Sequence, residues 1–222
     1  MAIALDLRER LIDSSTNCYR LFNGEGDRLP GLVCDIYGTV AVIQFDGLSC
    51  FEFWDQNFIA DWLLENIEVH SVYFKPRFSD SLQPQWWGEE LANNEIEVKE
   101  NDISFKVDFI SGQKTGFFLD QRDNRKYIQT LSKGLKTLNL FSYTGGFSMY
   151  AGAGGAAEVT SVDIAHEAIR VADKQWELNG FSQGDHQGVC ADVFEFIEKS
   201  SGVWDLVIVD PPSMTHSEKN KE

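Results

Sequence analysis

The sequence predicts an α/β protein of two parts: a small α/β domain over 1–110, then a Rossmann-like domain over 111–222. Two observations support this division. In the first part, two strand-like runs joined by a tight turn precede a helical stretch, which is typical of a small α/β layer. In the second part, short apolar runs alternate with helical stretches of about 7–15 residues, which indicates βαβ units and a parallel sheet.

The elements of the first part follow from local patterns. Apolar residues at helical spacing predict helices over 5–12 and 51–65. Tyr37-Gly38 between two apolar runs is a hairpin signal. Residues 76–94 are expected to form a connecting loop or a partial insertion. The expected strands are 31–36, 39–45, 69–74, 96–99 and 103–109.

The second part begins with an expected helix over 120–133, which Asp120 caps and whose apolar face consists of Tyr127, Ile128 and Leu131. The glycine-rich run 151–155 follows a helix and precedes a strand, so we interpret it as a helix end and turn rather than a phosphate loop. The expected strands are 136–141, 158–162, 187–191 and 205–209, and the further expected helices are 146–151, 166–179 and 193–199.

Charge is unevenly distributed along the chain. Its 19 Lys+Arg and 35 Asp+Glu give a formal net charge of −16, which excludes a protein whose whole surface binds nucleic acid. Residues 1–110 carry 8 basic and 20 acidic side chains, whereas 111–222 carry 11 and 15. A basic strip over 114–136 is the one place expected to accept a phosphate backbone, with a solvated helix face as the alternative. Its cations are Lys114, Arg122, Arg125, Lys126, Lys133 and Lys136.

Several classes of protein are excluded. The four cysteines form no CxxC pair, which excludes a disulfide scaffold and a zinc ribbon and favours reduced thiols in the cytoplasm. Cys190 is expected inside a strand as a buried structural thiol. No apolar run approaches the roughly 18 residues that span a membrane, and the first residues do not form a signal peptide. The four histidines lack metal-ligand spacing, so no metal site is expected.

The candidate site lies where the strands of the second part end, because ligands of an open parallel sheet bind beyond its carboxyl ends. Gly145-Gly146 after the first of these strands lets the backbone approach a ligand closely. Asp163 after the second strand can accept hydrogen bonds from both hydroxyls of a ribose. Asp192 after the third can accept from an exocyclic amine, while Val193 and Phe194 cover an adenine face.

After the fourth strand comes Asp210-Pro211-Pro212, a turn that its prolines hold open for a substrate. Each of these elements is weak alone, because a glycine pair is often a plain turn and a lone acid often caps a helix. Their order at four successive strand ends indicates one nucleoside-containing cofactor.

Three motifs resemble class I S-adenosylmethionine-dependent methyltransferases: LNLFSYTGGF over 138–147, Val162-Asp163 and the Asp-Pro-Pro turn. Stretches 112–125 and 20–32 resemble large-subunit ribosomal RNA methyltransferases that make 5-methylcytosine and usually carry an N-terminal PUA domain. The resemblance covers residues 17–216. It implies an α/β methyltransferase fold, S-adenosylmethionine as the cofactor, and ribosomal RNA as the partner.

The resemblance also implies roles for individual residues. Asp210, Pro211 and Pro212 are expected to position the substrate base. The residues that it assigns to the cofactor are Tyr143, Thr144, Gly145 and Gly146 at the methionine part, Asp163 at the ribose, Asp192 at the adenine, Ile164, Val193 and Asp210 beside them, and Lys114, Phe118 and Arg122 closing over the whole.

Two departures from the family bear on activity. No PUA domain precedes Arg20, and the methyltransferase domain is expected to be truncated after its fourth strand, before the family's nucleophilic cysteine. Methylation at cytosine C5 needs such a thiolate, so the chain alone is expected to be inactive. Its last strand, 206–209, is then expected to form an open sheet edge through which the chain self-associates.

Other functions remain open on the sequence. The Asp-Pro-Pro turn also serves methylases of amino groups, although Ser213 stands where these usually carry an aromatic residue. A guanine-N7 ribosomal methylase has similar motifs. A module that only binds S-adenosylmethionine or RNA is the non-enzyme alternative. A dinucleotide oxidoreductase is disfavoured, because no G-x-G-x-x-G follows the first strand of the second part.

Overall fold

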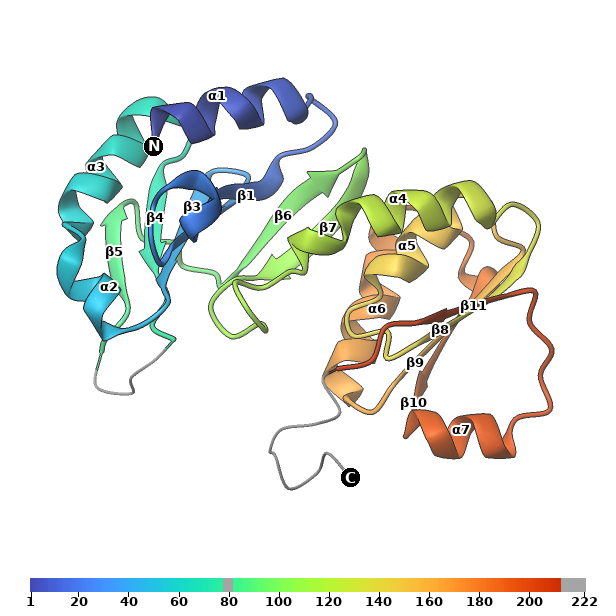
Figure 1. Ribbon diagram of the computed structural model, residues 1–222. Helices are drawn as coiled ribbons and strands as arrows, with labels where there is room; N and C mark the ends of the chain where they lie inside the picture. The colour runs from blue at the N-terminus through green and yellow to red at the C-terminus, as the bar shows by residue number, and fades with distance from the viewer. Residues whose placement is uncertain (78–81, 213–222) are drawn as a thin grey trace. The chain divides into compact units, whose positions relative to one another are not determined.

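The computed structural model describes residues 1–77 and 82–212 (Figure 1), and its contacts divide the chain into two compact units, Met1–Gln121 and Arg122–Glu222. The expected boundary was at residues 110 and 111. The segment after 110 belongs to the first unit, where Thr115 Oγ1 donates to Asp35 and the Phe117 ring packs on Phe105. Each unit is described by itself below.

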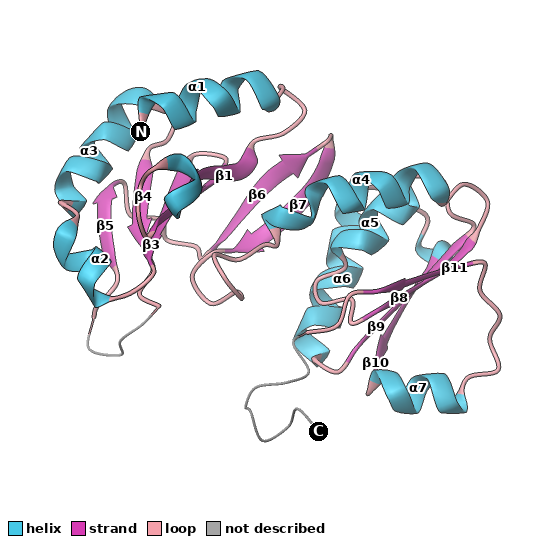
Figure 2. Ribbon diagram, viewed as in Figure 1, coloured by secondary structure: helices cyan, strands magenta, loops and turns pink. Residues whose placement is uncertain are grey.

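The first unit combines a five-stranded sheet with a separate two-stranded ribbon (Figure 2). The strand order of the larger sheet is β1-β2-β3-β4-β5, and β6 pairs with β7. The elements are α1 (Ala2–Leu11), β1 (Cys18–Asn23), β2 (Leu32–Tyr37), β3 (Val40–Phe45), α2 (Leu48–Phe53), α3 (Gln56–Asn66), β4 (Ser71–Phe74), β5 (Gln85–Gly88), β6 (Glu95–Glu100), β7 (Ile103–Asp108) and the 3₁₀ turns η1 (Gly24–Asp27) and η2 (Leu119–Gln121).

The hairpin expected at Tyr37-Gly38 is confirmed. Strands β2 and β3 pair antiparallel with Tyr37 opposite Val40, and Gly38 adopts a φ of 56°. Such a left-handed backbone costs glycine little, which is why the turn can be this tight. The apolar sides of the strands and of α3 then form one core, to which Phe22, Phe74 and Ile59 belong.

Two expectations for the first unit are wrong, and one strand was not predicted. The single helix over 51–65 is two helices, because the Asp55 carboxylate accepts from the Phe58 N–H at 3.1 Å and starts α3 afresh. Strand β5 lies inside the expected loop, where half-exposed Trp86 and Trp87 gave no clear alternation. Strand β1 was not predicted at all; it pairs with β2 across a bulge between Arg20 and Phe22 that breaks the alternation of its side chains.

The second unit is a four-stranded parallel sheet in the order β10-β9-β8-β11. Successive residues of a strand face opposite sides. Asn139 of β8 therefore bonds to Ser148 of α5 on one face, while Leu138 and Leu140 pack with Val193 of α7 on the other. The elements are α4 (Arg122–Leu131), β8 (Lys136–Leu140), α5 (Gly146–Ala153), β9 (Glu158–Asp163), α6 (His166–Leu178), the 3₁₀ turn η3 (Gln183–Asp185), β10 (His186–Cys190), α7 (Val193–Lys199) and β11 (Leu206–Val209).

This arrangement confirms the predicted α/β fold class with a parallel sheet in the second unit, where β11 lies beside β8 at an edge of the described sheet. The run 151–155 is a helix end and turn as expected, since α5 ends at Ala153 and Gly155 has a φ of 80°. The first helix differs: α4 begins at Arg122, and Asp120 lies in η2 instead of capping it. Its expected apolar face is wrong, because Tyr127 and Leu131 are exposed.

Candidate functional site

The loop between β8 and α5 has a strained backbone. Phe141 and Tyr143 adopt φ angles of 56° and 47°, and Gly145 one of 79°. A left-handed conformation costs a non-glycine residue about 1–2 kcal/mol, so surrounding contacts must hold the two aromatic residues in place. One such contact ties the loop to β9, where the Ser142 N–H donates to the Val162 carbonyl at 3.0 Å.

Asp163 provides a second tie. Its Oδ2 accepts from the Tyr143 N–H at 2.8 Å, and its Oδ1 accepts from the Ala165 N–H at 2.9 Å. A carboxylate oxygen can accept more than one hydrogen bond, so both oxygens keep acceptor capacity for a ligand. The side chain that the sequence suggested for a ribose therefore also fixes the loop beside it.

Asp192 has a clear structural role. Its Oδ1 accepts from the N–H groups of Phe194 at 2.9 Å and Glu195 at 3.0 Å, which makes it the N-cap of α7. Apolar surface lies beside it and beside Asp163, since the side chains of Phe194 and Ile164 are 56% and 70% exposed. Such surface can cover a flat aromatic ligand.

The parallel register brings the predicted site residues to one edge of the sheet. Leu140 pairs with Val162 and with Val209, and Cys190 pairs with Asp163, so all four strands end at the same level. Asp163 is the last residue of β9, and the glycine loop, Asp192 and the Asp-Pro-Pro turn follow the ends of the other three strands. Asp210 and both prolines of the turn are exposed.

Three other predicted cofactor residues do not follow a strand of the second unit's sheet. Lys114 and Phe118 belong to the first unit, where the Lys114 ammonium is 3.0 Å from Asp120 Oδ1 and 4.4 Å from the centre of the Phe118 ring. Arg122 begins the second unit, and its Nε is 3.5 Å from Asp123.

The basic strip is weaker than its sequence suggests. Arg125 is only 2% exposed, with its guanidinium 5.9 Å from the centre of the Tyr150 ring, so it is not a surface cation. Lys114, Arg122 and Lys136 each form an ion pair with a nearby carboxylate. The remaining members, Lys126 and Lys133, are exposed.

Cys190 is exposed, so its expected burial is wrong. It ends β10, an edge strand of the described sheet, and its Sγ lies 3.5 Å from the Ile164 carbonyl oxygen. Cys18 and Cys34 are buried. Burial raises the pKa of the Cys34 thiol well above its ordinary value, and the neighbouring Asp35 raises it further. This thiol is therefore unsuited to act as a thiolate.

A buried polar chain that sequence reasoning missed lies between the sheet and α5. The Asn139 amide donates to Ser148 Oγ at 2.9 Å, Ser148 and Ser161 share a 2.6 Å bond, and Ser161 Oγ lies 2.9 Å from His186 Nε2. His186 Nδ1 is in turn 3.3 Å from Asp173. The signal was present in β8, where the polar residues Thr137 and Asn139 alternate with Leu138 and Leu140.

The loop itself fits a polar ligand. Ser142 is 6% exposed, and its Oγ has no hydrogen-bond partner among the described residues. A buried hydroxyl without a partner is costly, and a ligand lying on the loop can supply one. Across residues 1–77 and 82–212, three or more His, Cys, Asp or Glu side chains nowhere gather as they would around a metal ion, and no helix there is long and apolar enough to cross a membrane.

Comparison with known proteins identifies the family. Residues 59–219, well over half of the chain, match the family described as "S-adenosylmethionine-dependent methyltransferase". The chain belongs to this family. Its cofactor is accordingly S-adenosylmethionine, as the resemblance implied.

Several relatives of this chain are named for ribosomal RNA. A ribosomal RNA large subunit methyltransferase of Deinococcus radiodurans is 39% identical over 93% of this chain and 53% of its own length. Ribosomal RNA large subunit methyltransferase I of Alteromonas mediterranea is 38% identical over 94% and 54%. The chain thus spans about half the length of the curated relatives it matches.

Solved structures agree with the sequence relatives. A Streptococcus mutans chain named as a SAM-dependent methyltransferase has a TM-score of 0.85 at 30% identity, with 95% of this chain and 56% of that chain covered. A methyltransferase solved in complex with S-adenosylhomocysteine (SAH) has a TM-score of 0.87 at 30% identity, with 99% and 58% covered.

Proposed function

We propose that the chain acts as an S-adenosylmethionine-dependent methyltransferase of large-subunit ribosomal RNA in the cytoplasm. The observation that carries the proposal is the loop between β8 and α5, fixed to Asp163 at the carboxyl edge of a parallel sheet. The names of relatives that are 38–39% identical support the RNA substrate. Bound S-adenosylmethionine supplies the methyl group.

The proposed roles of the residues follow the sequence and the contacts. The loop Tyr143, Thr144, Gly145 and Gly146 binds the methionine part, Asp163 binds the ribose, and Asp192 with Ile164 and Val193 binds the adenine. Asp210, Pro211 and Pro212 position the base. We include Lys114, Phe118 and Arg122 among the cofactor residues on the resemblance of their stretch to the family.

The proposed target atom is C5 of cytosine, because the stretch 112–125 resembles enzymes of that kind. Of the four cysteines only Cys190 lies in the second unit, on the edge strand opposite β11, which leads to Asp210. The chain alone is therefore expected to bind the cofactor without methylating cytosine. Methyl-transfer assays on unmodified ribosomal RNA, with mass spectrometry of the nucleosides, distinguish C5 from guanine N7 or an amino nitrogen.

Calorimetric titration with SAH tests the cofactor site. We expect Asp163→Ala to weaken binding by about 1.5–3 kcal/mol, roughly ten- to hundredfold, because a hydrogen bond to a charged group is removed. The exposed Asp185→Ala is the matched control and should bind SAH like the unchanged chain. An analogue of SAH without ribose hydroxyls separates the two roles of Asp163: it should bind the unchanged chain and Asp163→Ala more equally than SAH does. Unchanged SAH binding by Asp163→Ala contradicts the ribose assignment.

We further propose that ribosomal RNA contacts the basic strip over 114–136 through its exposed members. Lys126→Glu with Lys133→Glu should weaken RNA binding and lower the slope of log affinity against log salt, by about 0.7 for each phosphate of a single strand that no longer meets a lysine. Lys174→Glu, an equally exposed change on α6, is the control. Crosslinks confined to residues 1–110 contradict this assignment.

Strand β11 is proposed to mediate self-association. It pairs only with β8 among the described strands, and the side chains of Val207 and Val209 are 48% and 59% exposed. Unpaired strand edges with apolar side chains favour pairing with a second copy. Sedimentation of the purified chain should show a dimer or larger species that Val209→Lys converts to monomer, whereas Val203→Lys, outside the strand, should not. A monomeric unchanged chain overturns the proposal.

A further inference from the structure

Helix α4 of the second unit carries apolar side chains on its outer face. Its inner face packs along α5 and includes Arg125, which is 2% exposed and lies over the Tyr150 ring (Figure 1). The outer face carries Tyr127 and Leu131, which are 64% and 41% exposed. Residues four apart are neighbours on a helix, so these two side chains form one apolar surface.

The ring of Tyr127 is available to a partner. Within the part of the chain that the structure describes, no other ring packs on it and no group hydrogen-bonds its hydroxyl. Thr130, one turn further along, donates its hydroxyl proton to the Tyr127 carbonyl at 2.7 Å and so remains bonded within the helix. An exposed tyrosine combines a flat apolar ring with a polar tip and has few rotatable bonds to immobilise, which suits it for recognition.

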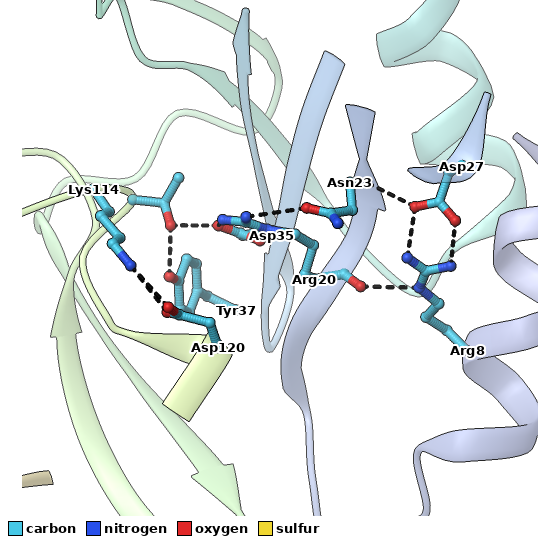
Figure 3. Close-up of polar contacts among 9 residues, drawn as sticks. Arg8, Arg20, Asn23, Asp27, Asp35, Tyr37, Lys114 and Asp120 are labelled. Atoms are coloured by element: carbon cyan, nitrogen blue, oxygen red, sulfur yellow. Dashed lines mark hydrogen bonds and ion pairs between the residues drawn. The ribbon is translucent and has the colours of Figure 1, made fainter. Parts of the chain in front are cut away.

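Charge identifies the class of partner. The helix and the turn after it, residues 122–136, carry five basic and one acidic side chain in a chain whose net charge is −16. Lys126 and Lys133 are exposed and form no ion pair with any described residue. Lys114, by contrast, pairs with Asp120 (Figure 3). The two exposed lysines therefore keep their charges for an anionic partner, and an RNA backbone is such a partner.

The neighbourhood of the ring favours an unpaired strand over a duplex. Lys126 directly precedes Tyr127, so one nucleotide can place its base on the ring and its phosphate at the ammonium group. Bases inside an A-form duplex stack on one another, whereas unpaired bases are free to stack on aromatic side chains. The one acid of the segment, Asp123, lies 3.5 Å from Arg122 Nε, which offsets its repulsion of a phosphate.

We propose that Tyr127 is a stacking platform for an unpaired base of the RNA substrate, with Lys126 at the phosphate of the same nucleotide. The inference rests on the proposed function, which places RNA on the basic strip. It adds the state of that RNA, single-stranded where it crosses α4, and a contact that does not depend on charge.

RNA titrations of the full chain, followed by fluorescence anisotropy, test the platform. The probes are an unstructured RNA of about twelve nucleotides and the same RNA annealed to its complement. Tyr127→Ala should weaken binding of the single strand about tenfold, the scale of one stacked base, and change duplex binding by less than about twofold. Tyr127→Phe keeps the ring and should stay within about threefold of the unchanged chain. Phe58→Ala, which removes a 58% exposed ring from α3 of the acidic first unit, is the matched control and should have no effect.

Two further readouts separate stacking from charge. Stacking releases no counterions, so Tyr127→Ala should leave the slope of log affinity against log salt unchanged, whereas Lys126→Glu should lower it by about 0.7. Ultraviolet crosslinking locates the contact directly. Trypsin cleaves after Lys126 and Lys133, so a crosslink at Tyr127 appears on the peptide 127–133 and should be lost in Tyr127→Ala.

The possible failures are distinguishable. Equal affinity of Tyr127→Ala and the unchanged chain for the single strand overturns the inference alone, provided that Lys126→Glu with Lys133→Glu still weakens binding. An equal loss on the duplex, or a loss of SAH affinity in Tyr127→Ala, also overturns it. A change in sedimentation of Tyr127→Ala would make the outer face of α4 a contact between copies of the chain and overturn it as well. Absence of RNA binding by the unchanged chain overturns the proposed RNA contact and this inference together.

Discussion

Gly145→Ala is expected to destabilise the second unit by about 2–5 kcal/mol and to weaken SAH binding strongly. The residue has a φ of 79°, which costs an alanine about 1–2 kcal/mol. Its added Cβ would lie 2.9 Å from the Cβ of Ala172 and 3.3 Å from Met149 Cε, so α6 or the loop must move. Overpacking of this kind costs about 1–3 kcal/mol more. Chemical denaturation and SAH titration measure the two effects.

Gly155→Ala separates the cost of the left-handed backbone from the cost of the steric clash between an added Cβ and α6. Gly155 has nearly the same φ, 80°, but an added Cβ would come no closer than 3.9 Å to Lys133 Cγ. It should therefore lose only the roughly 1–2 kcal/mol of backbone strain and bind SAH normally. Equal behaviour of the two variants would show that the contact with α6 has no part in shaping the loop.

The second large effect is a loss of stability in mild acid. Burial lowers the pKa of His186, against an opposing influence of Asp173, and the imidazole side chain is only 3% exposed. A group with a lowered pKa stabilises the fold fully above its unfolded pKa, near about 6.5, and this stability is lost as the pH falls below that value. Between the unfolded and folded pKa values the loss is about 1.4 kcal/mol per pH unit. Urea denaturation at a series of pH values from about 7.5 down to about 5 measures it.

The geometry explains why protonation is opposed. With Nδ1–H directed at Asp173, Nε2 of neutral His186 accepts from Ser161 Oγ. A protonated Nε2 would donate to Ser161 Oγ instead, so the Ser161 proton would have to turn to Ser148 Oγ, which already accepts from Asn139. His186→Gln should flatten the pH dependence, whereas the exposed His166→Gln should leave it unchanged. The pKa values of Asp27 and Asp120 are lowered despite the opposing effect of burial, because Arg8 and Lys114 pair with them, so their stability is lost only in stronger acid. A flat profile for the unchanged chain contradicts the assignment to His186.

The fold and candidate site of the second unit could be predicted from the sequence because the candidate site residues lie at the ends of its strands. Alternation of strands and helices predicted the sheet, and Gly145, Asp163, Asp192 and Asp210 could be placed at its carboxyl edge without knowing side-chain contacts. The double role of Asp163 could not be predicted, because its bond to the Tyr143 N–H depends on the register of β8 and β9.

The buried face of α4 and the hydrogen bond between Asp35 and Thr115 could not be predicted from the sequence either, because both depend on tertiary contacts. The face of α4 that is buried contains Arg125 and not Tyr127, a choice made by the packing of α4 on α5 and not by hydrophobic period. The bond between Asp35 and Thr115 joins residues 80 positions apart, and neither residue differs in type from many acids and threonines that face solvent. Only the folded chain distinguishes them.

The hydroxyl and amide groups enclosed between the sheet and α5 also determine how β8 and β9 align. Asn139 sits opposite Ser161, and both reach Ser148. If β8 slid along β9 by two residues, the same sides would still face α5, so apolar packing alone would tolerate the shift. Asn139 would then stand opposite Val159 or Asp163 and lose its link through Ser148 to Ser161, leaving polar atoms buried without partners. The three side chains thus select one register of β8 against β9 among those that apolar packing would allow. That register also sets where the loops after β8 and β9 begin at the cofactor edge of the sheet.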